Sequence, residues 1–293
     1  MAGLCAARVL SEHADEVVVL ERDDLLDESS PRRGVPQGRH AHAILASGEG
    51  LIAGWFPGIL DDLVRRGAVR GDNGDSRWYQ AGAFKVECDT GLMATMASRP
   101  LLEGTVRSHL RSRTNVVVRS GVHVDSLLMD GKRVTGVVLE GGERLAADLV
   151  VDCSGRSTRF PQMLADMGFQ GPAVSEVKIN MSYATRILRR RPDDLKQAYM
   201  IIAPTPPYEN RFGVLLAMED DRWILTVGGF HGDDCPTDDD GFRAYVRSLP
   251  VPDLADLYER AEVLSPVMTH RLPSNQRRHV EKLTSPPAGY LML

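Results

Sequence analysis

Two stretches of the sequence carry residue types that could bind a nucleotide, and the first runs from Gly3 to Glu21. Residues 3–13 place apolar side chains at helical spacing, and the apolar residues 17–20 are typical of a buried parallel strand. Glu21 follows Gly3 by 18 positions, which is close to the roughly 20 expected between a phosphate-loop glycine and the acid that binds an adenosine ribose. The stretch predicts the second half of a βαβ dinucleotide-binding unit, with an ordinary amphipathic helix on a strand as the alternative.

The second stretch is an apolar strand over residues 148–152 that ends in a polar turn, Asp152-Cys153-Ser154-Gly155-Arg156-Ser157. Such a continuous apolar run is again typical of a strand buried on both faces. No base is recognisable beside the Cys153 thiol, so we expect a buried structural cysteine there rather than a nucleophile.

Two histidines, His40 and His42, are two positions apart and would share one face of an extended segment, as metal ligands can. No third ligand is recognisable nearby, so we expect no metal site and a structural or cofactor-proximal role. Five bulky aromatic residues are candidates for either a pocket or the core: Trp78, Tyr79, Tyr183, Phe212 and Trp223.

The elements that must position these residues fall into two groups along the chain. Helices are expected over 42–55 and 101–111, and short strands over 116–119, 122–129 and 134–140, separated by the glycine turns 130–132 and 141–142. After about residue 175 the pattern changes to long antiparallel strands, and then to a helical stretch over 238–263 interrupted by Pro250 and Pro252. The strands are expected over 177–188, 198–203, 212–218 and 222–230.

Composition excludes several classes of protein. The 293 residues are 43% hydrophobic and 26% charged with a net charge of -5, which indicates a globular protein and gives no field for nucleic acid. The four cysteines form no CxxC pair, which argues against a disulfide framework and a zinc site and favours a reduced, cytoplasmic setting. No apolar run is long enough for a transmembrane helix, and no secretory signal is recognisable.

Three enzyme classes lack their residues here. None of the seven tyrosines is followed four positions later by the lysine of a short-chain dehydrogenase, and the G-x-S-x-G of a serine hydrolase does not occur. A SAM-dependent methyltransferase would also end a strand in an acid. It has no need of the segment at Arg99 or of the turn at 152–157.

Four segments together resemble the FAD-dependent monooxygenases of the p-hydroxybenzoate hydroxylase fold over essentially the whole chain, and within them most of all the bacterial FAD-dependent epoxidases and hydroxylases. The four segments are residues 21–23, 36–42, 98–103 and 148–157. The resemblance implies an α/β protein with a Rossmann-like FAD-binding domain, containing a parallel sheet and a β-meander, and an inserted antiparallel-sheet substrate domain. The FAD-binding domain would comprise 1–70, 99–175 and 265–293, and the substrate domain 71–98 and 176–264.

The resemblance also implies which residues contact the cofactors, FAD and a transient NAD(P)H donor. Gly3 matches the last glycine of the phosphate loop, Glu21 the ribose-binding acid, and Arg22 would lie beside the adenine. Arg39 and Arg99 match arginines near the pyrophosphate and flavin. Val124, on the strand expected over 122–129, stands where this family presents backbone to the adenine. Asp152, Ser154 and Gly155 stand at an Asp-Gly motif that approaches the pyrophosphate and the donor, with Ser154 in place of the motif's Asp.

Two parts of the family pattern are not found. The chain starts at Met1-Ala2, where the phosphate loop would have its middle, and ends at Tyr290-Leu291-Met292-Leu293, where a Gly-Asp motif would follow. We therefore expect a chain truncated at both ends. No catalytic residue is assigned, because flavin hydroxylation needs no protein nucleophile.

The activity that the resemblance implies is monooxygenation. It would hydroxylate or epoxidise a small apolar, aromatic, polyketide or isoprenoid substrate with NAD(P)H and O2. The alternatives are a flavin-dependent reductase of isoprenoid double bonds and a non-catalytic fragment without FAD.

Overall fold

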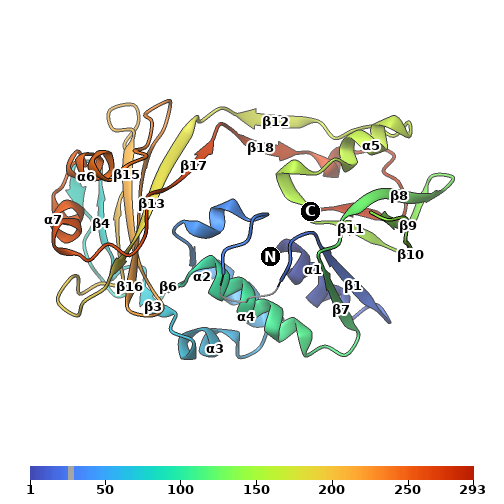
Figure 1. Cartoon of the computed structure of the whole chain (residues 1–293), viewed down its shortest axis with the longest axis horizontal. Helices are drawn as coiled ribbons and strands as arrows, with labels where there is room; N and C mark the ends of the chain where they lie inside the picture. Colours follow the sequence, from blue (N-terminus) through green and yellow to red (C-terminus); the bar gives the residue numbers. More distant parts are fainter. Residues whose placement is uncertain (26–29) are drawn as a thin grey trace. The chain divides into compact units, whose positions relative to one another are not determined.

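The computed structural model describes residues 1–25 and 30–293, which form two compact units (Figure 1). Unit 1 comprises Met1–Asp27, Val106–Val177 and Asn275–Leu293, and unit 2 comprises Glu28–Thr105 and Lys178–Ser274. Residues 30–70, 99–105 and 265–274, which the sequence analysis placed in an FAD-binding domain, cluster with unit 2, and residues 176–177, placed in the substrate domain, cluster with unit 1. The two compact units are defined by contacts within the chain, whereas the predicted domains are defined by the ligand that each would bind. The predicted domain assignment therefore stays a prediction.

Unit 1 contains parallel strand pairs beside its first helix. Helix α1 (Ala2–Leu10) packs against β1 (Val17–Glu21) and β11 (Val150–Asp152). Strand β1 pairs in parallel with β7 (Val116–Ser120), and β11 pairs in parallel with β19 (Tyr290–Met292). The helix and strand predicted from residues 3–20 are therefore confirmed, together with the parallel pairing expected of a βαβ unit.

A three-stranded antiparallel meander completes the core of unit 1. It consists of β8 (Val124–Asp130), β9 (Arg133–Leu139) and β10 (Arg144–Ala146). Its buried side chains pack with Leu164 of α5 (Phe160–Asp166). An exposed ribbon of β12 (Val174–Val177) and β18 (Asn275–Arg278) also belongs to this unit. The hairpin predicted at the glycine turn 130–132 is confirmed. The strand that follows the turn 141–142 is β10 rather than the predicted 148–152, whose last residues pair in parallel with β19 instead.

Unit 2 is built on a seven-stranded sheet whose pairings are antiparallel except between β14 and β4. Its order is β17 (Met268–Leu272), β13 (Met181–Arg189), β16 (Arg222–Gly229), β15 (Arg211–Met218), β14 (Tyr199–Ile202), β4 (Arg77–Gln80) and β5 (Ala83–Phe84). The single strand predicted over 177–188 is wrong at its start. The extended backbone is interrupted between β12 and β13. There Asn180 adopts a φ of 42° and donates its backbone N–H to Pro273 O.

The two faces of this sheet differ. Helices α6 (Asp239–Arg247) and α7 (Asp253–Arg260) cover one face (Figure 1), where fully buried Trp223, Leu225 and Phe242 lie in the core. The side chain of Asp238 caps α6 by accepting the Gly241 N–H at 2.8 Å. Along β13, Ala184, Arg186 and Leu188 face the helices, whereas Tyr183 and Thr185 face the opposite side.

The opposite side of the sheet carries a second, smaller layer. A three-stranded sheet of β2 (Ala43–Ile44), β6 (Met93–Met96) and β3 (Val69–Asp72) contributes Ala94 and Met96 to a core with Tyr199 and Ile224. Three helices and a 3-10 turn complete the unit: η1 (Pro36–Arg39), α2 (Ala46–Trp55), α3 (Ile59–Arg65) and the start of α4 (Arg99–Arg111). The helix expected from residue 42 begins at Ala46, because Ala43 and Ile44 pair with β6.

The α/β class predicted from the sequence is confirmed, with parallel pairs in unit 1 and a large antiparallel sheet in unit 2. No helix within the described residues has the length and apolar character needed to cross a bilayer.

Candidate functional site

In unit 1, several of the residues predicted to bind a nucleotide lie at the carboxyl ends of the two strands that contact α1. A Cβ added to Gly3, in the first turn of α1, would lie 3.5 Å from Cys153 Cβ, directly after β11. Glu21 is the last residue of β1, against which the same helix packs. Open α/β sheets bind their ligands at this edge, where a helix N-terminus also favours anions.

Local hydrogen bonds hold Glu21 at the end of its strand. Its Oε1 accepts the backbone N–H of Asp23 at 3.0 Å, and its carbonyl oxygen accepts the N–H of Val122 at 3.0 Å. The neighbouring Arg22 is exposed and makes no ion pair with any residue that the structure describes. The strand end therefore carries a carboxylate and a guanidinium on consecutive residues.

Asp152 organises the turn after β11. It is 4% exposed and accepts the N–H of Ser154 at 2.8 Å, the hydroxyl of Ser154, the hydroxyl of Thr158 at 2.6 Å and the hydroxyl of Tyr290 at 3.1 Å. Burial, and then the charge of Asp152, raise the pKa values of the Cys153 thiol and the Tyr290 phenol. With four donors on its carboxylate, Asp152 shapes the turn from within.

The turn that Asp152 shapes presents exposed backbone. Gly155 has a φ of +73°, a conformation that favours glycine, and a Cβ placed there would meet no atom within 4 Å. Arg278 of β18 fixes the turn from the other side by donating to Arg156 O at 2.8 Å. Ser154 and Gly155 are thus accessible to a ligand that approaches the backbone closely.

Val124 lies apart from these residues, at the start of β8. Its side chain packs against the meander core, and the ladder shifts register directly after it, between Val124 and Ser126. An interrupted ladder leaves backbone groups without their regular strand partners. The backbone at this position, rather than the side chain, is the part suited to a ligand.

In unit 2, two arginines predicted to bind the cofactor lie around the 36–42 loop. Arg39 is exposed and has no ion-pair partner within the described chain. Arg99 packs against Gly38, whose added Cβ would lie 3.7 Å from Arg99 Cγ, and stands 3.6 Å from the carboxylate of Glu103. Buried Glu103 also forms an ion pair with Arg32. Arg32 and Arg99 therefore share the buried carboxylate of Glu103 beside the loop that carries Arg39.

His40 is buried against the sheet face opposite α6 and α7. Its Nδ1 lies 2.8 Å from Thr185 Oγ1, which lies 2.7 Å from Thr226 Oγ1, and Thr226 accepts the N–H of Ala41. Burial, together with the charges of His270, His42 and Arg39, lowers the pKa of His40 to about 4. His40 is therefore neutral at pH 7.

His40 Nδ1, Thr185 and Thr226 form one continuous hydrogen-bond chain. Each hydroxyl in it can donate or accept, so the chain can run in either direction and serves both neutral tautomers of the His40 ring. The ring of Tyr183 packs edge-on against it at 4.7 Å, and that of His270 lies at 5.8 Å.

His42 is oriented differently from His40. Its Nδ1–H donates to the carbonyl oxygen of His40 at 2.8 Å, which leaves Nε2 as its basic nitrogen. Burial lowers the pKa of His42, and the charge of Arg99 lowers it further. The two histidines do not share a ligand position, and no group of three metal-binding side chains occurs in the described ranges 1–25 and 30–293.

The aromatic candidates divide between core and site. Trp223 is fully buried among α6 and α7. Tyr183 lies in the His40 cluster, and Phe212 packs against Phe230 at 5.7 Å. The phenyl ring of Phe212 lies so close to Gly228 that a Cβ there would meet it at 2.7 Å. The sequence analysis did not identify three members of this cluster: Thr185, Thr226 and His270.

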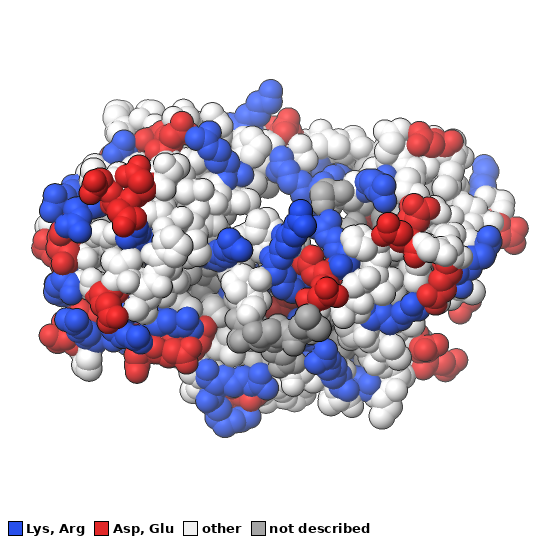
Figure 2. All heavy atoms as spheres, viewed as in Figure 1, with Lys and Arg blue, Asp and Glu red and all other residues white. Residues whose placement is uncertain are grey.

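The face shown in Figure 2 has no concentration of one charge, because Lys and Arg alternate with Asp and Glu over it. A protein that binds nucleic acid by charge needs a basic patch or stripe, and this face has none.

Comparison with solved structures defines the class of the fold. PqsL, a probable FAD-dependent monooxygenase from Pseudomonas aeruginosa, superposes with a TM-score of 0.73 at 14% identity, covering 100% of this chain and 75% of PqsL. The flavin-dependent brominase Bmp2 gives 0.69 at 12% identity, covering 99% and 68%. The chain has the p-hydroxybenzoate hydroxylase-like fold of the FAD-dependent monooxygenases and halogenases, so the predicted resemblance is confirmed at the level of the fold.

Sequence comparisons add one related protein and one family model. Protein Rv3254 of Mycobacterium tuberculosis (strain ATCC 25618 / H37Rv) is 35% identical over 307 aligned residues, covering 99% of this chain. The chain spans 64% of the length of Rv3254. A family model described as tryptophan halogenase matches residues 101–170.

Proposed function

We propose that this chain forms part of an FAD-dependent monooxygenase that hydroxylates or epoxidises a small apolar, aromatic, polyketide or isoprenoid substrate with NAD(P)H and O2. The observation that carries the proposal is the placement of α1, which lies with Gly3 against the turn after β11 and also packs against β1, the strand that ends in Glu21. The name of PqsL, a probable FAD-dependent monooxygenase, supports the oxygenase class.

The residues of unit 1 fit the nucleotide part of FAD. The first turn of α1 carries no acidic residue and has no side-chain cap among the described residues, so its N–H groups suit a diphosphate. Glu21 would bind the ribose hydroxyls, and Arg22 and the backbone at Val124 would contact the adenine. Gly155, with open space at its Cα, suits a close backbone approach. Asp152 would act through the turn that it holds, and Ser154 through its exposed backbone.

The residues that we propose for the cofactor in unit 2 are Arg39 and Arg99. The Nε of Arg99 is buried, faces the Glu103 carboxylate at 3.6 Å and makes no hydrogen bond within the described residues, so the Arg99 guanidinium has unused hydrogen-bonding capacity. Arg39 offers an exposed guanidinium that can bind phosphate oxygens in a bidentate manner.

When bound and reduced by NAD(P)H, FAD supplies the activation of dioxygen. The protein then needs a site that orients the substrate and excludes water. We assign these tasks to the sheet face around His40, Tyr183 and Phe212. There neutral His40 is held by Thr185 at Nδ1 and offers Nε2 for a hydrogen bond, and the aromatic rings provide apolar contact.

The test is the visible absorption spectrum of the purified chain, alone and after incubation with FAD followed by gel filtration. We expect the flavin bands to be retained. Glu21→Ala or Arg39→Ala should weaken the free energy of FAD binding by roughly 1.5–3 kcal/mol, the contribution of a charge-assisted hydrogen bond. Glu16→Ala and Arg33→Ala remove exposed residues of the same charge and serve as matched controls. A colourless chain that takes up no FAD would favour the non-catalytic alternative, and unchanged affinity in both site variants would remove the site assignment.

Halogenation is the second candidate, because the tryptophan halogenase model matches residues 101–170 and Bmp2 is a brominase. Oxygen uptake with NAD(P)H and candidate substrates separates the classes. A monooxygenase incorporates oxygen without halide, and a halogenase requires chloride or bromide. A reductase of isoprenoid double bonds would transfer electrons to the olefin without consuming oxygen.

A further inference from the structure

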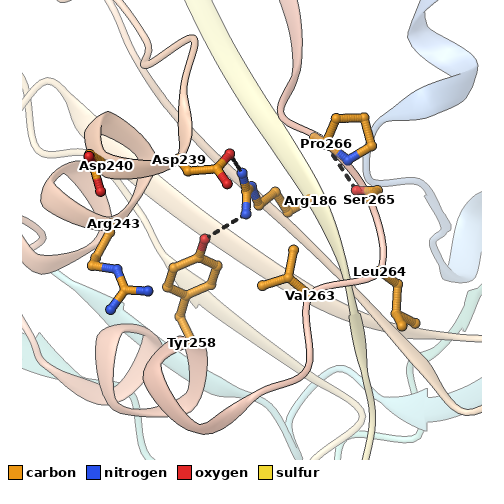
Figure 3. A pocket seen from close by; sticks show the side chains of 9 residues that line it. All are labelled: Arg186, Asp239, Asp240, Arg243, Tyr258, Val263, Leu264, Ser265 and Pro266. Atoms are coloured by element: carbon orange, nitrogen blue, oxygen red, sulfur yellow. Dashed lines mark hydrogen bonds and ion pairs between the residues drawn. The ribbon is translucent and has the colours of Figure 1, made fainter.

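A cavity of about 560 Å³ lies in unit 2, on the side of the sheet that α6 and α7 cover (Figure 3). Its lining comes from β13, the two helices and residues 263–266, and includes none of the residues proposed for the cofactor or substrate. Its size falls within the range of roughly 300–1,000 Å³ that is typical of small-molecule sites.

The cavity contains a buried positive charge. The side chain of Arg186 is only 4% exposed. It donates to the hydroxyl of Tyr258 at 3.0 Å and forms an ion pair with Asp239, and both contacts are drawn in Figure 3. Its Nε has no hydrogen-bond partner in the part of the chain that the structure describes. Buried charges are normally paired and fully hydrogen-bonded, so Arg186 retains an unused donor.

Tyr258 provides a second donor at the same place. Its hydroxyl oxygen accepts from Arg186, whereas its own proton has no acceptor among residues 1–25 and 30–293. Burial raises the pKa of Tyr258, so the phenol keeps this proton at neutral pH. The two side chains together offer hydrogen-bond donors to an incoming oxygen acceptor.

The carboxylate now paired with Arg186 can be exchanged. The side chain of Asp239 is 81% exposed, and an ion pair with one solvated partner contributes little to stability. A second carboxylate can therefore take its place at Arg186. The hydroxyl of Ser265 is already used, since it accepts the N–H of Ile187 and donates to Pro266 O.

The remaining lining indicates the rest of the ligand. Val263, Leu264 and Pro266 form an apolar wall beside Arg186 in Figure 3. Asp240 and Asp239 balance the charges of Arg186 and Arg243, and Arg243 is itself paired with Glu259. The site therefore has no excess positive charge, which disfavours a dianion such as phosphate more than a singly charged carboxylate.

We propose that this cavity binds a small monocarboxylate with an apolar body, such as an aryl or short alkyl carboxylate. Its carboxylate replaces that of Asp239 at Arg186 and accepts the proton of Tyr258, and its apolar body packs on Val263, Leu264 and Pro266. The proposal does not depend on FAD binding.

The test is isothermal titration of the full chain with benzoate, with its neutral analogue benzamide and with inorganic phosphate. We expect saturable 1:1 binding of benzoate, and binding of benzamide and phosphate at least about tenfold weaker, since each loses a charge-assisted hydrogen bond or the apolar contact. Binding of phosphate as tight as that of benzoate would overturn the ligand class. A benzoate titration that does not saturate would overturn the site.

Three variants locate the binding. Arg186→Gln should weaken benzoate at least about tenfold. Arg189→Gln should leave it unchanged, because Arg189 lies on the same strand but pairs with Glu262 outside the cavity. Asp239→Asn should tighten benzoate severalfold, because it removes the carboxylate that competes for Arg186 and keeps a polar side chain of the same size in the first turn of α6. Equal benzoate affinity in Arg186→Gln and Arg189→Gln would refute the proposal, and so would the absence of a gain in Asp239→Asn. If Arg186→Gln does not fold, Asp239→Asn decides the question.

Discussion

Acidification should destabilise the folded chain through His40. The pKa of this histidine falls from 6.5 to about 4 in the folded state because the ring is buried near His270, His42 and Arg39. Between these two values the unfolded chain binds a proton that the folded chain does not. Stability from this group is therefore complete above about pH 6.5 and is lost as the pH falls towards 4. At about 1.4 kcal/mol for each pKa unit, the loss is about 1 kcal/mol near pH 5.5 and between about 2 and 3 kcal/mol near pH 4.5.

Urea unfolding of the wild type and of His40→Asn, measured at pH values from 7.5 to 4.5, checks this reasoning. Asparagine keeps a group that can accept from Thr185 but cannot titrate. The variant should be less stable than the wild type at neutral pH, and the gap should close by the amounts above on acidification. His42 is present in both proteins, so its own lowered pKa cancels in the difference.

The matched control is His123→Asn, which replaces an exposed histidine and should preserve the wild-type pH dependence. Wild-type and His40→Asn stability curves that run parallel from neutral to acidic pH would refute the argument. They would mean that His40 titrates normally in the folded chain and that the Thr185–Thr226 hydrogen bonds tolerate a charged ring.

Two further predictions concern packing and hydrogen bonding. Asp152→Ala should lower the free energy of unfolding by about 3 kcal/mol, because at least two donors, including Tyr290, lose a charged acceptor at a buried position, and a loss below about 1 kcal/mol in urea titration would contradict its organising role. Gly228→Ala should destabilise by about 2 kcal/mol or more, because its Cβ would meet Ser182 O at 2.4 Å and Tyr183 Cβ at 2.6 Å, and a melting temperature equal to that of the wild type would show that the sheet relaxes freely.

The elements that the sequence predicted well are those whose signals are local. The α1–β1 unit, the β8–β9 hairpin and the long antiparallel strands follow from apolar periodicity and glycine turns, which depend on neighbours in the chain. The break at Asn180 escaped prediction, because it depends on a backbone contact with Pro273 far along the sequence.

The site was predictable only where a motif is contiguous. Gly3 and Glu21 could be recognised by spacing alone. The partners of His40 could not, because Thr185 lies 145 positions away and threonine in a strand gives no distinct signal. The role of Asp152 was equally hidden, since the sequence suggests a ligand-binding acid whereas the hydroxyl of Tyr290, 138 positions away, helps to engage it internally.

Strand β13 carries two unrelated tasks on consecutive residues. Thr185 holds His40 on one face of the sheet, and Arg186 enters the cavity on the other. Because strand side chains alternate, inserting or deleting one residue before Thr185 would exchange the faces of both. The strand is thus the place where insertion scanning should find the least tolerance. A substitution there can change the contacts of Thr185 or of Arg186 alone. A change of strand length would displace both side chains at once.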